Sequence, residues 1–348
     1  MEQQSHKPLI KVENLSIGYR LKKGEWKVVH PNVEFSLYSG ELTTLIGLNG
    51  TGKSTLIRTL CKFQPPINGS IEICGKDIIQ YTPAEFSLKV GVVLTEKSNI
   101  SGMSVYETVA LGRYPYTGFF GKLKPNDREI IEEAIRNVGI EHKAFCNINE
   151  LSDGERQRTM IAKALAQECP VIILDEPTAF LDVAGRMEIM ALLHKSAVTY
   201  NKSILLSTHD IDNAFMYADK FLLLSKDSQV HCDTPEELIL NGTMSKFFSH
   251  RGMTLDMITG HLSMGSYENP IGIEGEAITA RWLSNALFRN GFSPTSPKEG
   301  LLNIDCKGAK EIYLNFPNGA KKRVNGITPA VENILNYVRE EDRDGISL

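Results

Sequence analysis

One short run constrains the fold of this chain more than any other feature. Residues 47–55 read GLNGTGKST, which satisfies the pattern GxxxxGK[ST], between an apolar run ending at Ile46 and the helix-compatible residues 56–60. A glycine-rich turn between a strand and a helix directs backbone N–H groups and the positive end of the helix dipole toward a phosphate. We expect Lys53 to reach the β- and γ-phosphates of a nucleotide and Ser54 to ligate Mg²⁺. The predicted loop comprises Gly47, Leu48, Asn49, Gly50, Thr51, Gly52, Lys53, Ser54 and Thr55.

Ionisable side chains follow two further apolar runs. Residues 171–174 (VIIL) lead directly to Asp175 and Glu176, and residues 204–206 (ILL) lead to His209 three residues later. Ligands of open α/β sheets bind at the carboxyl ends of strands, so these side chains should lie beside the phosphate loop. We expect Asp175 to hold Mg²⁺, Glu176 to be the general base toward the attacking water, and His209 to sense the γ-phosphate. The plainer alternatives are carboxylates that cap the next helix and a structural histidine.

The apolar runs also indicate the fold class, which is α/β. Continuous apolar character is typical of strands that are covered on both faces of a parallel sheet, and it recurs at residues 42–46, 90–94, 171–174, 204–206 and 221–224. Earlier residues alternate between apolar and polar, at 9–19 and 27–37, and indicate an antiparallel β edge. Residues from about 98 to 167 lose strand character and indicate a helical insertion. We therefore expect a nucleotide-binding domain over residues 8–255.

A smaller second domain is expected after the first. Glycine, serine and asparagine residues indicate a linker at 256–275, and residues 276–348 are expected to form a small α+β accessory domain. Two amphipathic helices and a hairpin turn at residues 317–320 predict a core of its own, with Trp282 and Phe316 among its members. This region has neither a phosphate loop nor a pair of carboxylates at a strand end, so we expect no chemistry in it.

Composition excludes several classes of protein. Apolar residues make up 42% and charged residues 23% of the 348 residues, as in soluble globular proteins. No apolar run approaches the ~18 residues that a membrane-spanning helix needs. The six cysteines form no CxxC pair and the N-terminus lacks the pattern of a secretory signal, which favours a cytoplasmic protein with reduced thiols. A net charge of -4 gives no electrostatic basis for nucleic-acid binding.

Residues 151–155, LSDGE, form a third candidate site ahead of a helical run. Ser152 followed three positions later by Glu155 is a capping box, and a capped helix start that exposes Ser152 and the Gly154 backbone is also an anion site. The phosphate loop already covers one side of a nucleotide. This second site therefore makes most sense if it faces a nucleotide on another copy of the chain.

The order of these motifs resembles the ATPase subunit of an ABC transporter. Residues 47–55 correspond to the Walker A motif, 151–155 to the signature, 171–176 to Walker B, 179–182 to the D-loop and His209 to the switch histidine. The resemblance covers roughly residues 8–255. It implies the P-loop NTPase fold, ATP and Mg²⁺ as cofactors, and an ATPase activity coupled to transport.

The resemblance also assigns roles that the residues alone do not reveal. It implies that Tyr19, which would otherwise be read as an ordinary strand residue, stacks on adenine, and that Asp182 of the D-loop belongs to the nucleotide site. Catalysis would then depend on Lys53, Glu176 and His209. The family further implies a head-to-tail homodimer, in which each Walker A motif closes against the partner's signature.

Within the family, residues 109–117, VALGRYPYT, resemble the importers of ferric siderophores, haem and cobalamin. The alternative is a loop of packing aromatics whose likeness is accidental. The resemblance implies integral membrane permease subunits as direct partners and an extracytoplasmic substrate-binding protein as an indirect one. It implies a peripheral location on the cytoplasmic face of the inner (plasma) membrane. The sequence does not specify which chelate is transported.

The sequence departs from the family at two places. Where glutamine usually follows the strand at 90–94, this chain has Thr95 and Glu96, and we expect one of the two to take the place of the glutamine. The Thr95 hydroxyl is the better candidate, because it can approach Mg²⁺ or its waters without adding a full charge. The signature carries Asp153 and Glu155 where Gly and Gln are commonest, which adds negative charge near a phosphate.

Two functions other than an importer subunit are possible for a chain with these motifs. A soluble ABC-type ATPase that acts on DNA or ribosomes commonly has paired cassettes or DNA-binding insertions, whereas this chain has one cassette and no basic stripe. A regulatory nucleotide-binding module that barely hydrolyses ATP is disfavoured by Glu176 and His209.

Overall fold

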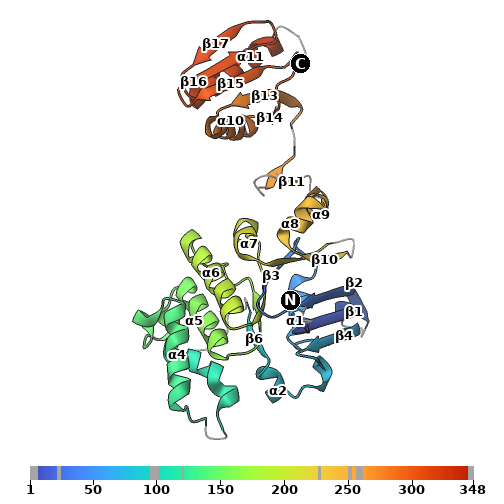
Figure 1. The fold of residues 1–348 in the computed structure, drawn as a ribbon, viewed down its shortest axis with the longest axis vertical. Helices are drawn as coiled ribbons and strands as arrows, with labels where there is room; N and C mark the ends of the chain where they lie inside the picture. The colour runs from blue at the N-terminus through green and yellow to red at the C-terminus, as the bar shows by residue number, and fades with distance from the viewer. Residues whose placement is uncertain are drawn as a thin grey trace, which may run out of the picture. The chain divides into compact units, whose positions relative to one another are not determined.

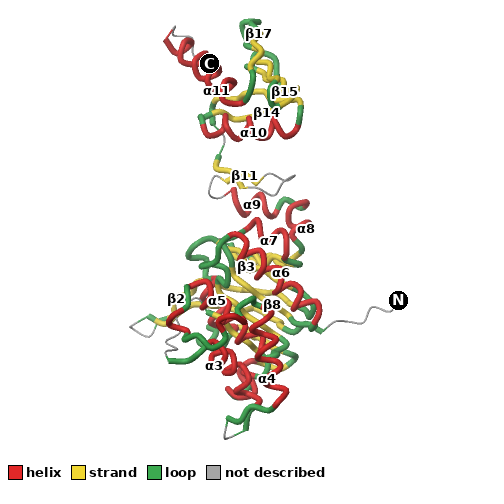
Figure 2. The backbone as a smooth tube through the Cα atoms, turned by 90° about the vertical axis from the view of Figure 1, so that its left-hand side faces the viewer, coloured by secondary structure: helices red, strands yellow, loops and turns green. Residues whose placement is uncertain are grey.

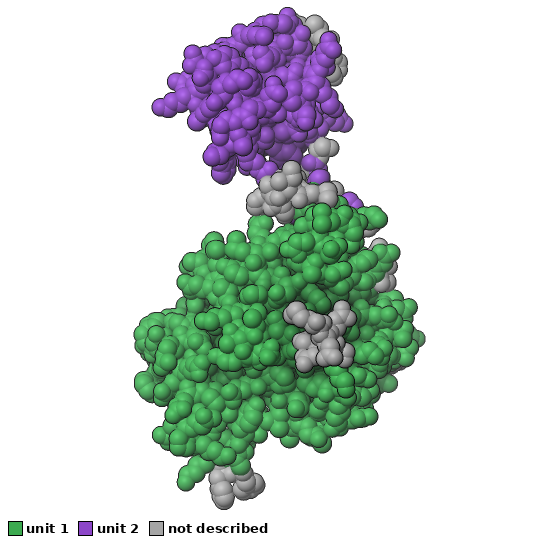
Figure 3. Space-filling view, viewed as in Figure 1, with its two compact units in different colours: residues 1–248, 255–261 green, residues 249–254, 262–348 purple. Residues whose placement is uncertain are grey.

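The computed structural model describes residues 7–21, 25–94, 102–118, 121–225, 229–249, 253–255, 262–265 and 267–343. The chain divides into two units, residues 1–248 with 255–261 and residues 249–254 with 262–348, which Figure 3 distinguishes by colour. None of the described helices has the length and apolar character required to cross a bilayer. The cysteines are free thiols.

A six-stranded sheet with the order β10-β9-β3-β8-β7-β6 forms the centre of the first unit (Figure 1). Neighbouring strands pair in parallel, except that β10 is antiparallel to β9. The strands are β3 (Leu42–Gly47), β6 (Val90–Val93), β7 (Val171–Asp175), β8 (Ser203–Ser207), β9 (Lys220–Leu224) and β10 (Val230–Asp233). Every residue of β3 and β8 is buried, which confirms that the continuous apolar runs are strands covered on both faces.

Each face of this sheet has its own hydrophobic core. Along β7, Ile172 and Leu174 belong to the core completed by α3, α4, α5 and α6, whereas Val171 and Ile173 belong to the core completed by α1 and the antiparallel sheet. Successive strand residues point to opposite faces, so both cores together fix the strand register. The helices of this unit are α1 (Lys53–Leu60), α2 (Pro83–Ser87), α3 (Val105–Ala110), α4 (Pro125–Asn137), α5 (Asp153–Ala166), α6 (Val183–Thr199), α7 (Ile211–Tyr217), α8 (Pro235–Leu240) and α9 (Thr243–Ser249), with short 3-10 turns η1 (Ile78–Gln80), η2 (Leu111–Tyr116), η3 (Glu141–Lys143) and η4 (Ile148–Glu150).

The two alternating segments near the N-terminus pair antiparallel, as predicted. They do not extend the central sheet but form a sheet of their own with the order β2-β1-β4-β5. Its strands are β1 (Ile10–Arg20), β2 (Trp26–Leu37), β4 (Asn68–Ile73) and β5 (Lys76–Asp77). The antiparallel edge of the central sheet is instead β10.

The segment between β6 and β7 is helical. From residue 102 to 167 the described elements are the helices and 3-10 turns α3, η2, α4, η3, η4 and α5 (Figure 2). The sole bridge between extended residues in this range joins Ser104 to Asn147. Capping boxes begin α3 at Ser104 and α5 at Ser152. Side-chain acceptors thus satisfy N–H groups that the first helical turn leaves unpaired.

The second unit is a mixed sheet with two helices. Its order is β14-β13-β15-β16-β17, in which β13 pairs in parallel with β14 and β15, and β15, β16 and β17 form an antiparallel meander. The elements are β13 (Asn269–Gly275), α10 (Ala277–Arg289), β14 (Phe292–Thr295), β15 (Asn303–Gly308), β16 (Glu311–Asn315), β17 (Lys321–Val324) and α11 (Ile327–Arg343). At the boundary between the units, β11 (Met253–Leu255) and β12 (Leu262–Met264) form a separate two-stranded sheet. The hairpin turn expected at residues 317–320 joins β16 to β17, so that prediction is confirmed.

Two expectations for this region are wrong. The linker expected over residues 256–275 contains β12 and β13, and Ile271 of β13 is a buried core residue. Trp282 is 61% exposed rather than buried, because the buried face of α10 runs through Leu283 and Leu287. Phe316 does pack against the core as a partly buried residue.

The separate core of the second unit leads to a first prediction. A chain truncated near Gly260 should keep near-normal levels of the basal ATP hydrolysis that the family resemblance implies, because the strands that lead to the phosphate loop and the carboxylates have their own two cores. Parallel assays of ATPase activity and transport would measure this, with transport or dimer stability expected to change. An unfolded or inactive truncated chain would show instead that the second unit is integral to the ATPase.

Candidate nucleotide-binding site

The phosphate loop joins the buried strand β3 to helix α1. Gly52 caps α1 with a φ of 100°, and a Cβ atom there would lie 2.7 Å from Cγ1 of Val29. Both the left-handed backbone and the close approach require glycine. The first residues of α1 therefore present their N–H groups at the mouth of the loop, where the helix dipole favours an anion.

The lysine of the loop is held inside it. Lys53 is 8% exposed, and its Nζ donates a hydrogen bond of 2.6 Å to the carbonyl oxygen of Gly47. Thr51 stabilises the turn through its N–H and its hydroxyl, which both donate to the carbonyl oxygen of Leu48, at 3.2 and 2.8 Å. The ammonium group is thus fixed beside the N-terminus of α1.

The two carboxylates and the histidine come together at the ends of β7 and β8. The Glu176 Oε1 and His209 Nε2 atoms are 2.9 Å apart. Asp175, the last residue of β7, accepts a hydrogen bond of 2.6 Å from the hydroxyl of Ser207. The N-cap of α6, the helix that follows β7, is Asp182, so neither Asp175 nor Glu176 is the cap that the plainer alternative expected.

Most residues of the predicted nucleotide site line one cleft of about 660 Å³. Its size is within the range of small-molecule sites. The lining includes Tyr19, Leu48, Asn49, Gly50, Gly52, Lys53, Ser54, Thr55, Glu176 and His209. Gly47 and Thr51 belong to the same loop but are not among the residues that line the cleft. The structure therefore brings the Walker A residues, the predicted general base and the switch histidine to one cavity.

Sequence reasoning missed three lining residues, Lys27, Val28 and Val29 of β2. Tyr19 of β1 pairs directly with Lys27 across the antiparallel ladder, and the Lys27 ammonium lies 5.5 Å from the centre of the Tyr19 ring. An aromatic ring and a cation are thus presented together at the edge of the cleft. Aligning the two alternating segments against one another would have identified Lys27.

The signature residues lie at the start of α5 and not among the residues that line the cleft. The Ser152 hydroxyl accepts from the Glu155 N–H at 3.3 Å and donates to Glu155 Oε2 at 2.9 Å, so the predicted capping box is confirmed. The extra negative charges have local partners, because Asp153 pairs with Arg156 at 3.1 Å and Glu155 lies 3.7 Å from Lys143. Hydrogen bonds from Ser152, above all, hold the pKa of Glu155 below its ordinary value.

The remaining predicted residues are placed differently. Asp182 is the N-cap of α6, where its Oδ1 accepts from the Gly185 N–H at 2.8 Å, and it does not contribute to the described lining of the cleft. The D-loop is nevertheless close to the signature, since a Cβ on Gly154 would lie 3.3 Å from the carbonyl oxygen of Phe180. Thr95, the expected substitute for glutamine, lies outside the described residues.

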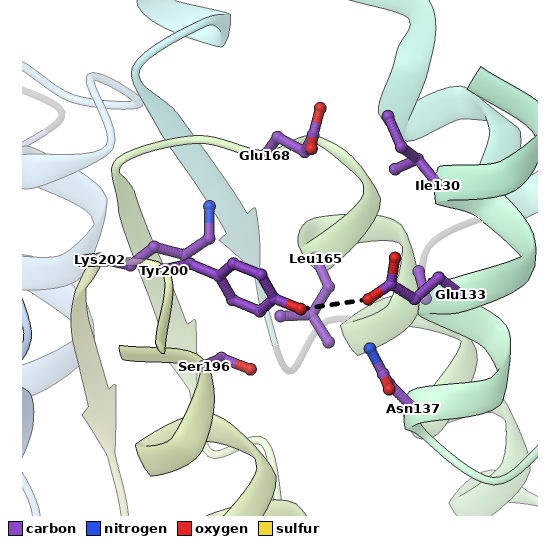
Figure 4. A pocket seen from close by; sticks show the side chains of 9 residues that line it. Ile130, Glu133, Asn137, Leu165, Glu168, Ser196, Tyr200 and Lys202 are labelled. Atoms are coloured by element: carbon purple, nitrogen blue, oxygen red, sulfur yellow. Dashed lines mark hydrogen bonds between the residues drawn. The ribbon is translucent and has the colours of Figure 1, made fainter. Parts of the chain in front are cut away.

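A smaller pocket of about 80 Å³ between α4, α5 and α6 has a structural explanation. Figure 4 shows the Tyr200 hydroxyl directed at Glu133, to which it donates a hydrogen bond of 3.1 Å. Burial lowers the pKa of Lys202, but its ammonium donates to the carbonyl oxygen of Cys169 at 2.8 Å. The lysine therefore joins the residue before β8 to the segment between α5 and β7, and the pocket adds nothing to the nucleotide site.

The fold and the cleft together define a nucleotide-binding P-loop protein of the α/β class. Comparison with known proteins identifies the family. Residues 31–179 match the ABC transporter family. An uncharacterised ABC transporter ATP-binding protein of Methanocaldococcus jannaschii is 38% identical over 263 residues, which are 76% of this chain and 88% of that protein. The ferric enterobactin transport ATP-binding protein FepC of Escherichia coli is 32% identical over 244 residues, 70% of this chain and 88% of FepC.

Solved structures agree with this assignment. A protein described as a metal-chelate type ABC transporter, in an inward-facing conformation, aligns with a TM-score of 0.60 and 30% identity over 71% of this chain and 91% of that chain. A dimeric bacterial ABC transporter cassette aligns with a TM-score of 0.58 and 27% identity over 65% of this chain and 98% of that chain. The chain therefore belongs to the ABC transporter ATP-binding proteins. It is an ABC ATPase.

The position of Lys53 generates a second prediction. Replacing Lys53 with alanine should weaken ATP binding by about tenfold or more, because a charge-assisted contact to the phosphates is lost. Isothermal titration calorimetry with ATP would measure the change, and circular dichroism would confirm that the variant is folded. Unchanged affinity in a folded variant would exclude a phosphate contact by this lysine.

Proposed function

We propose that this chain is the ATP-hydrolysing subunit of an importer for a ferric siderophore or a related metal chelate such as haem or cobalamin. ATP-driven closure of a homodimer would power the transport. The observation that carries the ATPase mechanism is the 2.9 Å contact between Glu176 and His209 in the cleft that contains Lys53. The importer assignment is supported by FepC, a ferric enterobactin transport protein, and by the similar metal-chelate type transporter.

In this proposal the chain's own residues perform distinct parts of hydrolysis. Lys53 and the N–H groups at the start of α1 bind the phosphates. Glu176 takes the proton of the attacking water through its carboxylate, as a general base. His209 orients that carboxylate from 2.9 Å and faces the γ-phosphate. Tyr19, which is 43% exposed at the cleft, offers its ring to the adenine.

The oxygen donors at the site fit Mg²⁺. Ser54 supplies a hydroxyl in the cleft, and Asp175 supplies a carboxylate at the end of β7. Magnesium is usually held by one or two carboxylates together with substrate phosphates and water, so a larger protein cluster is not needed. When bound, Mg²⁺ neutralises charge on the phosphate oxygens.

The placement of the signature supports a head-to-tail homodimer. Ser152 is the N-cap of α5 and Gly154 lies in its first turn, a helix start that suits an anion, but neither residue contributes to the described lining of their own cleft. We propose that they contact the nucleotide of a second copy. The dimeric form of the similar bacterial cassette is consistent with this arrangement.

A groove in the first unit supports the proposal of a permease partner. It measures about 900 Å³ and is lined largely by apolar side chains, among them Phe63, Leu94, Leu111, Tyr114 and Met160. Phe63 and Tyr114 are 60% and 70% exposed, and an exposed apolar surface of this kind is typical of an interaction site. Leu94 directly precedes the segment that begins at Thr95. We propose that a cytoplasmic segment of the permease occupies this groove.

Copurification from native membranes would test the proposed function. We expect a polytopic permease to copurify, with a metal-chelate binding protein as the indirect partner, and the chain to be peripheral on the cytoplasmic face of the inner (plasma) membrane. Ribosomes or DNA in place of a permease would favour the soluble ABC-type ATPase. The net charge of -4 gives no support to that alternative.

The role of Glu176 generates a third prediction. Replacing Glu176 with glutamine should leave ATP binding intact and lower turnover by about 10²- to 10⁴-fold, the usual contribution of a positioned general base. The variant should also accumulate as an ATP-bound dimer. Steady-state hydrolysis and size-exclusion chromatography with ATP would measure both effects. Turnover at the parent rate would refute the assignment of Glu176 as base.

The groove generates a fourth prediction. Replacing Tyr114 with alanine should lower permease-stimulated hydrolysis, because exposed aromatic side chains contribute strongly to protein interfaces, while basal hydrolysis stays unchanged. Phe145, which is 87% exposed in the same helical segment but outside the described groove lining, provides the matched control. Both rates would be measured with and without permease in lipid vesicles. Equal losses in the Tyr114→Ala and Phe145→Ala variants would exclude a specific role for the groove.

A further inference from the structure

Ser207 lies in the central sheet between the strand of the phosphate loop and the strand of the carboxylates. It is the last residue of β8 and is 0% exposed. In the ladder it pairs with Leu45 of β3 on one side and with Asp175 of β7 on the other. Its hydroxyl therefore lies between the strand that leads into the phosphate loop and the strand that ends in the two carboxylates.

The chemistry of its two partners fixes the direction of both Ser207 hydrogen bonds. The hydroxyl is 2.6 Å from Asp175 Oδ1 and 2.9 Å from the backbone nitrogen of Glu176. An N–H group only donates and an ionised carboxylate only accepts, so the hydroxyl donates to Asp175 and accepts from Glu176. One buried oxygen thus binds two consecutive residues that have different roles.

The bond to Glu176 holds an uncommon backbone conformation. Glu176 has a φ of 49°, in the left-handed region that non-glycine residues seldom adopt. This turn directly after β7 accompanies the approach of the Glu176 carboxylate to His209, 2.9 Å away. Strained residues at functional sites persist when surrounding contacts determine their conformation, and the Ser207 hydroxyl is such a contact.

We propose that Ser207 is a positioning residue for ATP hydrolysis, which orients the Asp175 carboxylate toward Mg²⁺ and fixes the turn that presents Glu176. This inference rests on the proposed roles of Asp175 and Glu176. Ser207 acts only through these two residues. Its loss should therefore weaken the dependence of nucleotide binding on Mg²⁺ as well as turnover.

The same strand provides a matched control. Ser203, the first residue of β8, is also 0% exposed, and its hydroxyl has no hydrogen-bond partner among the described residues. Ser203→Ala and Ser207→Ala thus remove the same group from equally buried positions of one strand. Ser207→Thr retains a hydroxyl, and Ser207→Val has nearly the same shape without one, so this second pair separates hydrogen bonding from packing.

The experiment measures ATP affinity by calorimetry with Mg²⁺ and with EDTA, and kcat and KM in parallel. We expect Ser207→Ala to reduce the Mg²⁺ enhancement of ATP affinity by about tenfold and to lower kcat by a similar factor, because a hydrogen bond to a charged group is lost. Affinity in EDTA should be unchanged. Ser203→Ala should match the parent, and Ser207→Thr should retain more Mg²⁺ enhancement than Ser207→Val.

Two results would overturn the proposal. One is an equal Mg²⁺ enhancement in the Ser203→Ala and Ser207→Ala variants, and the other is equal behaviour of the threonine and valine variants at position 207. Glu176→Gln in the same assays tests the underlying mechanism separately. If that variant loses turnover while the position 207 variants behave like the parent, only the role of Ser207 is refuted.

Discussion

The parallel pairing of β3, β8 and β7 is the constraint on which the rest of the site depends. Ser207 of β8 is paired with Leu45 on one side and with Asp175 on the other, so these three strands end at the same edge of the sheet. The phosphate loop, the carboxylates and His209 all follow directly from those ends. A slip by one residue would exchange the two faces of a strand, and the cores on both faces oppose such a slip.

The nucleotide site could be predicted from sequence wherever its determinants are contiguous. The phosphate loop needs a strand, a glycine-rich turn and a helix in succession, and all three are encoded within residues 42–60. The two carboxylates at the end of β7 can be predicted in the same way, because they directly follow an apolar run in the sequence. Ser207 could not be found in this way, since its hydroxyl acts on Asp175, 32 residues away, and its sequence context is an ordinary apolar strand. Lys27 was missed because it reaches the cleft through the pairing of β2 with β1.

In the second unit, prediction from contiguous sequence patterns fails at two places. The glycine residues in 256–275 predict a linker, but Gly275 has a φ of 110°, and a Cβ atom there would lie 2.1 Å from the carbonyl oxygen of Cys306. The glycine serves close strand packing, which a single sequence does not distinguish from a loop. The exposure of Trp282 does not follow from the sequence, because the residues three and four positions away along the helix include both buried and exposed ones. Periodicity identified the helix but not its inner face.

The motif that pointed to metal-chelate importers has a structural basis of its own. Arg113 is 4% exposed, and its guanidinium pairs with Asp127 at 2.9 Å and with Glu168 at 2.7 Å. The backbone N–H of Lys124 and then Arg113 hold the pKa of Asp127 below its ordinary value. Buried ion pairs seldom add net stability, since desolvation offsets their attraction, but they are strongly directional.

The fixed geometry of the Arg113 ion pairs matters because Arg113 lies within η2, the segment that also contains the groove residues Tyr114 and Pro115. The same guanidinium donates to the carbonyl oxygen of Ala166 at 2.8 Å, and the hydroxyl of Tyr116 donates to that of Gln167 at 2.8 Å. One wall of the groove is therefore fixed to the end of α5, the helix that the signature begins. The wall of the groove and the signature are therefore placed at the two ends of one 14-residue helix.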